Sequence, residues 1–426
     1  MASYKGGWIA LRSRDFRYLA AGQLLSLTGS QMQQVAVVWQ LYLLTHSPLA
    51  LGLLGLFRVL PVVLFALWGG AIADAFDRRR LMLVSQSLLA TVSLLFTVAT
   101  YLGWASPYLT YGLSFFAGAA LAVDSPARQA LLPALVPREQ LANALSVYFL
   151  VWQISTVIGP PLAGLLLAKK AIVTVYAVDT VSFIAVLAAL LMLKHRAPPQ
   201  QRADISIRSV LEGLSFIRST PLIYTMMLLD FFATFLGGSM LLMPIFADQV
   251  LKVGAQGLGI LYAAQPVGAA LAAAVLSTVR LPRRQGATVL WAVATYGMAI
   301  ALFGLSPYFW LSLLALAISG AADSVSAVVR QTLRQLLTPD PLRGRMSSVS
   351  MIFFIGGPQL GEVEAGMVAK AFGARVSVAS GGLLCVVAAA IVAIFVPALR
   401  RYEAGQFTAP QSGIPTSKTV PPPLSS

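Results

Sequence analysis

The sequence predicts an all-α integral membrane protein in which twelve transmembrane helices form two pseudo-symmetric six-helix halves. Composition is the first observation: 58% of the 426 residues are hydrophobic and only 11% are charged, against about 25% charged residues in soluble domains. The second is a series of apolar runs that can each cross a bilayer, and the third is a repeat between the two halves. Because no soluble core could bury so much apolar surface, lipid must be its solvent.

The apolar runs follow one another along the chain, and each is about 20 residues or longer, which is the length that crosses a bilayer. They cover residues 17–44, 49–73, 81–102, 107–130, 141–168, 171–193, 221–247, 255–279, 286–305, 308–330, 346–369 and 375–397. Turn-forming pairs such as Ser47-Pro48 and Ser306-Pro307 separate them. Each run therefore predicts one transmembrane helix.

The distribution of Lys and Arg predicts the orientation of these helices, because cytoplasmic loops carry an excess of both residues. With a cytoplasmic N-terminus, the inner segments hold 24 of the 30 Lys and Arg residues and the outer segments hold 5. The remaining one, Arg58, lies inside a span. We therefore expect a multi-pass protein of the cell inner (plasma) membrane with both termini in the cytoplasm.

The longest break between spans divides the chain into four predicted parts. Within this break, Val210, Leu211, Leu214 and Ile217 share one helical face, which predicts an amphipathic helix on the inner leaflet. The parts are an N-terminal six-helix half (1–193), this cytoplasmic linker (194–220), a C-terminal six-helix half (221–403) and a disordered tail (404–426) rich in Pro, Ser and Thr.

The two halves match in sequence at a constant offset of 202 residues. Arg128-Gln129 falls on Arg330-Gln331, Pro137 on Pro339, Ser146-Val147 on Ser348-Val349, Gly159 on Gly361, and Ala163-Gly164 on Ala365-Gly366. Single matches arise by chance, but a run in constant register does not. Two six-helix halves related by a repeat are the architecture of secondary transporters, which bind substrate near the bilayer midplane between the halves.

Two short motifs and one longer segment resemble those of a known family. The loop Gly70-Ala-Ile-Ala-Asp74-Ala-Phe-Asp77-Arg78-Arg79 follows the pattern Gly-x-x-x-Asp-(Arg/Lys)-x-Gly-(Arg/Lys)-(Arg/Lys), except at Ala75 and Asp77. The segment Gly159-Pro160-Pro161-Leu162-Ala163-Gly164 follows Gly-Pro-x-x-Gly-Gly, except at Ala163. The first motif resembles that of the major facilitator superfamily and the second that of its drug/proton antiporters, and the resemblance covers all twelve spans. The segment LMPIFADQVLKVGAQGLGILYAAQPVGAA is similar to the enterobactin-exporter and macrolide-efflux branch.

The resemblance implies a proton-coupled exporter of small amphipathic or anionic organic molecules, such as siderophores, macrolides or other drugs, that works by alternating access. A nutrient importer on the same scaffold and a non-transporting membrane scaffold or sensor are the alternatives. The fifth-span motif argues against import. Buried charges argue against a scaffold, because they cost stability without a pathway to serve. The substrate and the choice between proton and sodium stay open.

Composition and motifs argue against other classes of function. The net charge of +15 comes from short loops between apolar runs, so it does not indicate nucleic-acid binding. One cysteine, Cys385, and two distant histidines, His46 and His195, argue against a metal site. The chain has no Gly-x-x-x-x-Gly-Lys-(Ser/Thr) signature for a nucleotide. We therefore predict no enzyme activity, no cofactor, a proton gradient as energy source, and a monomer whose partners are a small-molecule substrate and the bilayer.

The charged loop after the second span predicts an anchor that contains a conformational latch. The latch residues are Gly70, Asp74, Asp77, Arg78, Arg79, Arg80, Asp124 and Arg128. The arginines keep the loop inside. The resemblance implies that Asp74 docks on the eleventh span, where a helix N-terminus favours an acid, and that a loop arginine pairs with Asp124. Asp124 also lies four residues before Arg128, so these two can pair on one helix face. The role of Asp77 stays open.

Polar residues inside the spans predict a transport pathway, because they are costly in lipid. The candidates for proton coupling and substrate contact are Gln31, Gln34, Arg58, Asp179, Asp230, Glu362 and Glu364. Arg58 and Asp230 each lie nine residues into a span, at a depth of about 14 Å. Arg58 should bind a substrate anion or form a structural ion pair. A carboxyl as deep as Asp230 can carry a proton, and Asp179 either does the same or pairs locally.

The glutamates and amides leave alternatives open. Glu362 and Glu364 point about 200° apart on a helix, so only one can face the pathway; we favour Glu362, with two packed, hydrogen-bonded glutamates as the alternative. The amides of the first span, including Gln31 and Gln34, either bond another helix or line a polar cavity.

Two further features predict local structure. Gly159, Pro160 and Gly164 predict a bend in the fifth span, with ordinary tight packing as the alternative. Asp323 and Arg330 lie seven residues apart on one face of the tenth span and predict a structural pair.

Overall fold

The computed structural model describes residues 8–75, 77–193, 214–215, 217–279, 282–339 and 343–403, and in these ranges every regular element is helical. The long and short helices are α1 (Arg14–Thr45), α2 (Pro48–Ala75), α3 (Arg78–Tyr101), α4 (Pro107–Leu131), α5 (Leu141–Ala168), α6 (Ile172–Met192), α8 (Pro221–Leu236), α9 (Met243–Ile245), α10 (Gly254–Thr278), α11 (Gln285–Leu305), α12 (Phe309–Leu337), α13 (Arg343–Phe372), α14 (Ala374–Phe395) and α15 (Pro397–Arg400).

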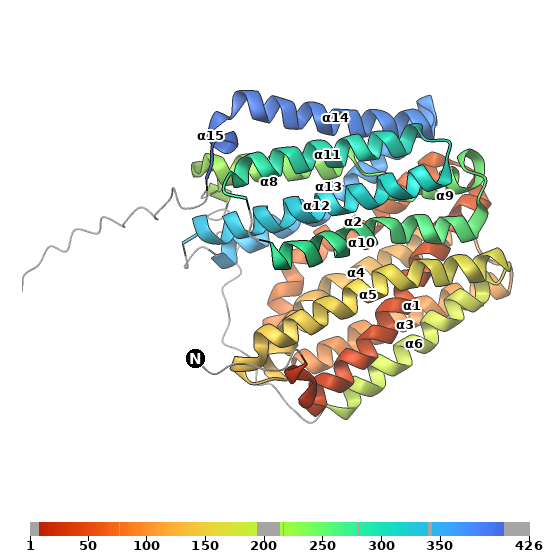
Figure 1. Ribbon diagram of the computed structural model, residues 1–426. Helices are drawn as coiled ribbons and strands as arrows, with labels where there is room; N and C mark the ends of the chain where they lie inside the picture. Colours follow the sequence, from red (N-terminus) through yellow and green to blue (C-terminus); the bar gives the residue numbers. More distant parts are fainter. Residues whose placement is uncertain are drawn as a thin grey trace, which may run out of the picture.

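Twelve spans account for this helical content, as predicted. Within the described ranges, nine segments are long and apolar enough to cross a membrane. Three further long helices, α1, α4 and α13, lie among them in the same bundle (Figure 1). The seventh span is composite, because α8 is followed by the short turn η4 (Met240–Leu242), α9 and the π-helical turn η5 (Phe246–Val250).

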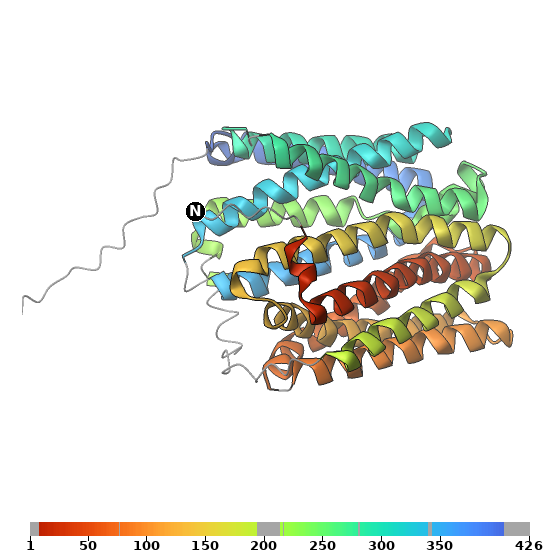
Figure 2. The same cartoon turned by 60° about the horizontal axis from the view of Figure 1, so that its bottom comes forward.

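The helices pack as two groups of six. In the first group α1 contacts α5 and α6, α2 contacts α4, and α3 contacts α4 and α6. In the second group α11 contacts α12 and α14, α10 contacts α12, and α13 contacts α8 and α14. In Figure 1 the second group lies above the first, and in the turned view of Figure 2 the blue helix α13 overlaps the yellow and red helices of the first group. They meet along two seams, α2 against α13 and α5 against α10.

Glycines bring the backbones of the two halves together at the seams. A Cβ atom added at Gly52 would lie 2.8 Å from the carbonyl oxygen of Glu362 and 3.0 Å from Cα of Gly366. A Cβ atom at Gly164 would lie 2.8 Å from the carbonyl oxygen of Ala255. Small residues are what allows membrane helices to approach so closely. Both seams are thus tight where α1 ends and α2 begins, which we call the closed end.

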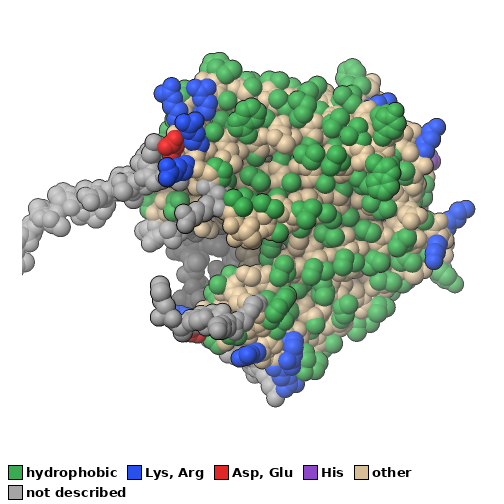
Figure 3. Space-filling model, viewed as in Figure 1, with side chains coloured by type: hydrophobic (Ala, Val, Ile, Leu, Met, Phe, Trp, Pro, Cys, Tyr) green, Lys and Arg blue, Asp and Glu red, His purple; other side chains and the backbone are tan. Residues whose placement is uncertain are grey.

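The opposite end of the bundle, where α1 begins, is the open end. Figure 3 shows the surface hollowed there, between the two halves. Hydrophobic side chains cover the flanks in the same view, and Lys and Arg gather at the two ends (Figure 3). This distribution is that of a protein whose flanks face lipid.

Parts of the predicted organisation fall outside the described residues. Of the expected amphipathic helix at 194–220, the structure describes residues 214–215 and 217–220. The tail at 404–426 lies outside the described residues. The domain boundaries at 193 and 221 therefore stay predictions.

Candidate functional site

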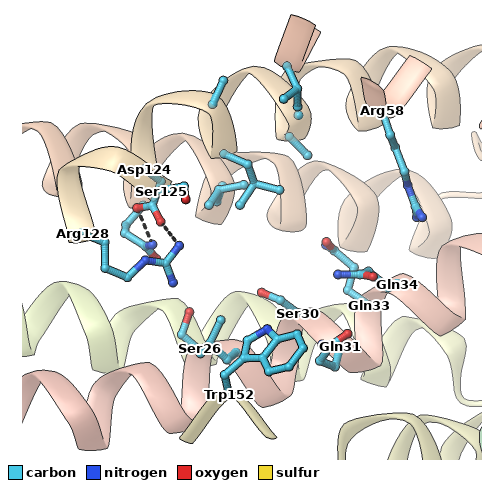
Figure 4. Close-up of a pocket in the computed structure, with 18 of the residues that line it drawn as sticks. Ser26, Ser30, Gln31, Gln33, Gln34, Arg58, Asp124, Ser125, Arg128 and Trp152 are labelled. Carbon is cyan, nitrogen blue, oxygen red and sulfur yellow. Dashed lines mark hydrogen bonds and ion pairs between the residues drawn. The ribbon is translucent and has the colours of Figure 1, made fainter. Parts of the chain in front are cut away.

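A cavity of about 790 Å³ opens among the helices of the first half and reaches α13 of the second half through Gln359. Its wall carries an unusual number of side-chain amides: Gln23, Gln31, Gln33, Gln34, Gln86, Gln129 and Gln359. Phe96, Phe149 and Trp152 supply aromatic surface, and Figure 4 shows Trp152 on the same side of the cavity as Gln31 and Ser30. The cavity can thus take a molecule with both polar and apolar parts.

Arg58 lies at the deep end of the cavity, far from the pair Asp124–Arg128 (Figure 4). Its side chain extends from α2 toward the side of α1 that carries Gln33 and Gln34 (Figure 4). Within the described residues, the ion pairs involve other cations, and Arg58 has neither a hydrogen bond nor a carboxylate within ion-pair distance. The alternative of a structural ion pair therefore lacks a partner in this part of the chain.

Asp124 and Arg128 form a neutral pair toward the open end of the cavity. Asp124 is fully buried, accepts hydrogen bonds from Ser85 Oγ at 2.9 Å and from Gln86 Nε2 at 2.8 Å, and pairs with Arg128 on its own helix. Arg128 also donates to the hydroxyl of Tyr148 at 2.9 Å. Of the two partners expected for Asp124, the structure shows Arg128, because four residues along a helix bring the two groups onto one face.

Two of the loop arginines, Arg78 and Arg79, bind main-chain carbonyl oxygens. Arg78 donates to the carbonyl oxygen of Ala130 at 2.8 Å, and Arg79 donates to those of Leu190 and Leu191 at 2.7 Å. These contacts satisfy free carbonyl groups at the ends of α4 and α6. The loop thereby ties three helices of the first half together.

Asp77 caps α3. Its Oδ1 accepts a hydrogen bond from the main-chain N–H of Arg80 at 2.9 Å, and its backbone is extended, as expected of an N-cap residue. An Asp directly before the first residue of a long apolar helix is a recognised start signal, and this signal could have given Asp77 its role from sequence. Gly70 lies in α2, and the side chain of Asp74 lies outside the described part of the structure.

Arg330 joins two acids in the second half. Its Nη2 lies 2.6 Å from Asp230 Oδ1 and 3.9 Å from Asp323 Oδ1, and its Nη1 donates to Ser326 Oγ at 2.5 Å. The expected pair between Arg330 and Asp323 is therefore longer than the pair between Arg330 and Asp230. The deep acid Asp230 thus has an arginine as its partner. Sequence reasoning missed this contact because α8 and α12 are far apart in the chain.

Glu362 binds the backbone at the break in the seventh span. Its Oε1 accepts from the N–H of Met240 at 2.9 Å and its Oε2 from the N–H of Leu241 at 3.0 Å. The hydroxyl of Tyr262 donates to the carbonyl oxygen of Met240 at 2.7 Å. Glu362 is buried and, within the described residues, is not part of the cavity wall. The expectation that it faces the pathway therefore stays a prediction, and in this structure the free N–H groups after α8 bind its carboxylate.

The remaining candidates differ in their access to the cavity. Gln31 and Gln34 line it, as does Ser30. Ser30 also donates to Oδ1 of the fully buried Asp179 at 3.3 Å, so this acid is joined to the cavity through one hydroxyl. The other oxygen of Asp179 has no partner among the described residues. Glu364 is half-buried.

Comparison with known proteins identifies the family. Residues 5–417 match the profile of the family described as "transmembrane secretion effector". The chain belongs to this major facilitator family. The superfamily and the twelve-helix fold predicted from the sequence are thus confirmed, and the proteins of this family are transporters and not enzymes.

Relatives of this major facilitator protein cover almost its whole length. The enterobactin exporter EntS of Escherichia coli O81 (strain ED1a) is 27% identical over 388 residues, which are 91% of this chain and 93% of that protein. EntS of Escherichia coli O139:H28 (strain E24377A / ETEC) is similar to the same extent, with 27% identity, 91% of this chain and 93% of that protein. The predicted enterobactin-exporter branch is therefore confirmed.

Solved structures show the same major facilitator fold. A POT family transporter in complex with 5-aminolevulinic acid has a TM-score of 0.75 at 12% identity, over 91% of this chain and 97% of that chain. A bacterial homologue of the iron transporter ferroportin in an inward-facing state has a TM-score of 0.67 at 16% identity, over 89% of this chain and 98% of that chain.

The fifth-span motif of this major facilitator protein serves close packing. Helix α5 continues through Pro160 and Pro161 without interruption. A Cβ atom at Gly159 would lie 2.9 Å from the carbonyl oxygen of Thr28 in α1, and Gly164 faces α10 across the seam. Helix α5 thus packs closely against α1 and α10. The bend predicted for the fifth span stays a prediction.

Proposed function

We propose that this chain is a proton-coupled exporter of small amphipathic organic molecules that works by alternating access. The observation that carries the proposal is the cavity of about 790 Å³, with amides, aromatic rings and an arginine, Arg58, that has no partner among the described residues. Drug-sized ligands occupy pockets of about 300–1,000 Å³. The named relatives are enterobactin exporters, so siderophores are the first substrates to test, with macrolides and other drugs next.

We place the open end in the cytoplasm. Exposed arginines at this end include Arg80, Arg284, Arg400 and Arg401, and such residues favour the cytoplasmic side. The structure then corresponds to an inward-facing state of a monomer in the inner membrane, with both termini in the cytoplasm. An exporter in this state can load substrate from the cytoplasm.

We assign the coupling ion as a proton. Four acids inside the spans can exchange one: Asp179, Asp230, Glu362 and Glu364. Carboxyl groups at membrane depth favour proton exchange, because the charged form is costly there. Protonation of Asp230 would remove the charge that pairs with Arg330. Protonation of Glu362 would remove the charge that binds two main-chain N–H groups at the helix break.

The proposal is tested in inverted membrane vesicles with an acidic lumen, to which enterobactin or erythromycin is added outside. An exporter of this orientation accumulates substrate in the lumen, and a protonophore abolishes the accumulation. A sodium gradient without a pH gradient serves as the control for the coupling ion. An importer would not accumulate substrate in this geometry, and a scaffold would move neither compound; either result would contradict the proposal.

A further inference from the structure

Arg58 lies where the cavity meets the seam between the halves. One turn before it on α2, a Cβ atom at Gly55 would lie 3.0 Å from the carbonyl oxygen of Gln359 and 3.1 Å from Cβ of Glu362. This face of α2 is therefore pressed against α13. Gln359 and Arg58 both line the cavity, so a ligand at Arg58 touches both halves of the protein.

The groups around Arg58 are committed to other partners. Tyr176, Tyr262 and Glu362 are the side chains that act on it electrostatically. Tyr176 donates its hydroxyl to Gln40 Oε1 at 2.7 Å, and Tyr262 donates to the carbonyl oxygen of Met240. Each oxygen of Glu362 accepts from a main-chain N–H. Glu362 thus acts on the charge of Arg58 from a distance and does not occupy its donors.

The described wall of the cavity carries one excess positive charge. Among its described lining residues the charged ones are Arg58, Asp124 and Arg128, and the last two neutralise each other. Arg58 is half-buried inside a span and has no partner among the described residues, which is unfavourable for a charged group. Its planar fork of five donors matches an oxyanion in two parallel hydrogen bonds. Arg58 is therefore suited to bind an anionic group of the ligand.

We propose that Arg58 is an anion subsite that favours, among the exported amphipathic molecules, those with a carboxylate or another planar oxyanion that binds there. The amides of α1, Gln31 and Gln34, accept or donate hydrogen bonds to polar groups beside the anion, and Trp152 packs against the apolar body. This inference rests on the proposed function, because it names the chemical class that the exporter selects.

Equilibrium binding to the purified full-length chain in lipid nanodiscs tests the inference. The probes are dansylglycine and dansylglycinamide, which share an aromatic body and differ in one negative charge. Wild type should bind the acid about ten- to a hundredfold more tightly than the amide, the ratio expected of a charge-assisted hydrogen bond. Arg58→Gln should lower the affinity for the acid to that for the amide and leave the latter unchanged.

Two further variants keep the test decisive. Arg284→Gln removes an exposed arginine that pairs with Glu403 and should bind both probes as wild type does. Arg58→Lys keeps the charge without the fork and should retain part of the preference; it replaces Arg58→Gln if the latter does not give the wild-type thermal unfolding transition. Any of three results overturns the inference. Wild type binds both probes with equal affinity, wild type binds neither probe, or the preference for the acid probe survives Arg58→Gln.

The outcome is separable from that of the vesicle experiment. Accumulation of enterobactin or erythromycin without a preference for the acid probe leaves export standing and removes the anion subsite. A preference that depends on Arg58, without accumulation of either compound, leaves the subsite standing and removes the proposed function.

Discussion

Asp77 stands where the related loop motif has glycine, and its carboxylate accepts the main-chain N–H of Arg80 at 2.9 Å. A glycine there would leave this donor of α3 without a side-chain acceptor. Next to it, Arg78 and Arg79 bind carbonyl oxygens at the ends of α4 and α6. The sequence predicted the anchoring role of the arginines through their charge. It did not predict their bonds, because carbonyl partners depend on where other helices end.

Asp77→Ala should destabilise the protein by about 1 kcal/mol, the usual cost of losing an N-cap. The variant should keep its orientation and transport, because the arginines remain. The thermal unfolding midpoint of purified protein measures the loss. Asp77→Asn is the matched control, since Asn caps helices as well as Asp does. If Asp77→Asn lowers the midpoint as much as Asp77→Ala, charge and not capping explains the effect.

Asp230→Asn should reduce proton-driven transport while membrane insertion is preserved. The substitution leaves Arg330 buried with Asp323 3.9 Å away as its remaining acid, and removing one member of a buried pair costs roughly 3 kcal/mol. Uptake into inverted vesicles over a range of lumenal pH measures transport. Asp323→Asn is the matched control, because the Asp323 side chain is 48% exposed against 19% for Asp230. Wild-type rates and pH dependence in Asp230→Asn would show that this acid is not the proton carrier.

At the scale of helices, the sequence was informative about which segments cross the membrane and less so about how they are interrupted. Twelve apolar runs predicted twelve spans because burial in lipid demands long apolar helices. The run at 221–247 was expected to be one helix, yet α8 ends at Leu236 and η5 begins at Phe246. Gly237 and Gly238 mark the break. The acid that caps it lies on α13, and no local pattern connects the two.

Glu362→Gln should weaken the capped break and reduce proton-driven transport. An amide has one accepting oxygen, so one of the N–H groups of Met240 and Leu241 loses its acceptor, at a cost of about 1–3 kcal/mol. Thermal unfolding and vesicle uptake measure the two effects. Glu364→Gln changes the same charge on a half-buried glutamate of the same helix and should affect stability less. A larger loss of stability in Glu364→Gln than in Glu362→Gln would contradict the capping role.

The whole molecule is closed at one end and open at the other, and the closed end has a polar contact besides its glycine seams. The hydroxyl of Tyr42 in α1 donates to Asp248 Oδ2 at 2.6 Å and accepts from Gln249 Nε2 at 3.1 Å. Asp248 and Gln249 belong to the π-helical turn η5 of the other half. This contact must break for the closed end to open. Sequence reasoning left Tyr42 unassigned because no motif includes it.

Tyr42→Phe should shift the equilibrium toward opening of the closed end. The variant keeps the ring and loses a hydrogen bond to a carboxylate, worth about 1.5–3 kcal/mol, or roughly a ten- to hundredfold change in population. Spin labels at Lys169 and Gln256, one in each half, should report a longer distance. Tyr111→Phe removes a hydroxyl that bonds the carbonyl oxygen of Ala50 within one half and should leave the distance unchanged. The same distance in wild type and Tyr42→Phe would show that the glycine seams alone hold this end.

Asp74 offers the test of whether the charged loop moves with the transport cycle. Topology depends on the balance of Lys and Arg, and Asp74→Asn leaves every one of them in place. A reporter fused to the C-terminus should therefore give the wild-type orientation. The resemblance to the major facilitator loop implies that Asp74 docks on the eleventh span when the open end closes. Without that contact the inward-facing state is favoured, and vesicle uptake should fall at least about tenfold if the contact is worth 1.4 kcal/mol or more. Asp77→Asn, which makes the same change of charge in the same loop, is the control. Undiminished uptake by Asp74→Asn would show that the loop is an anchor without a latch, and an inverted reporter would show that Asp74 itself contributes to topology.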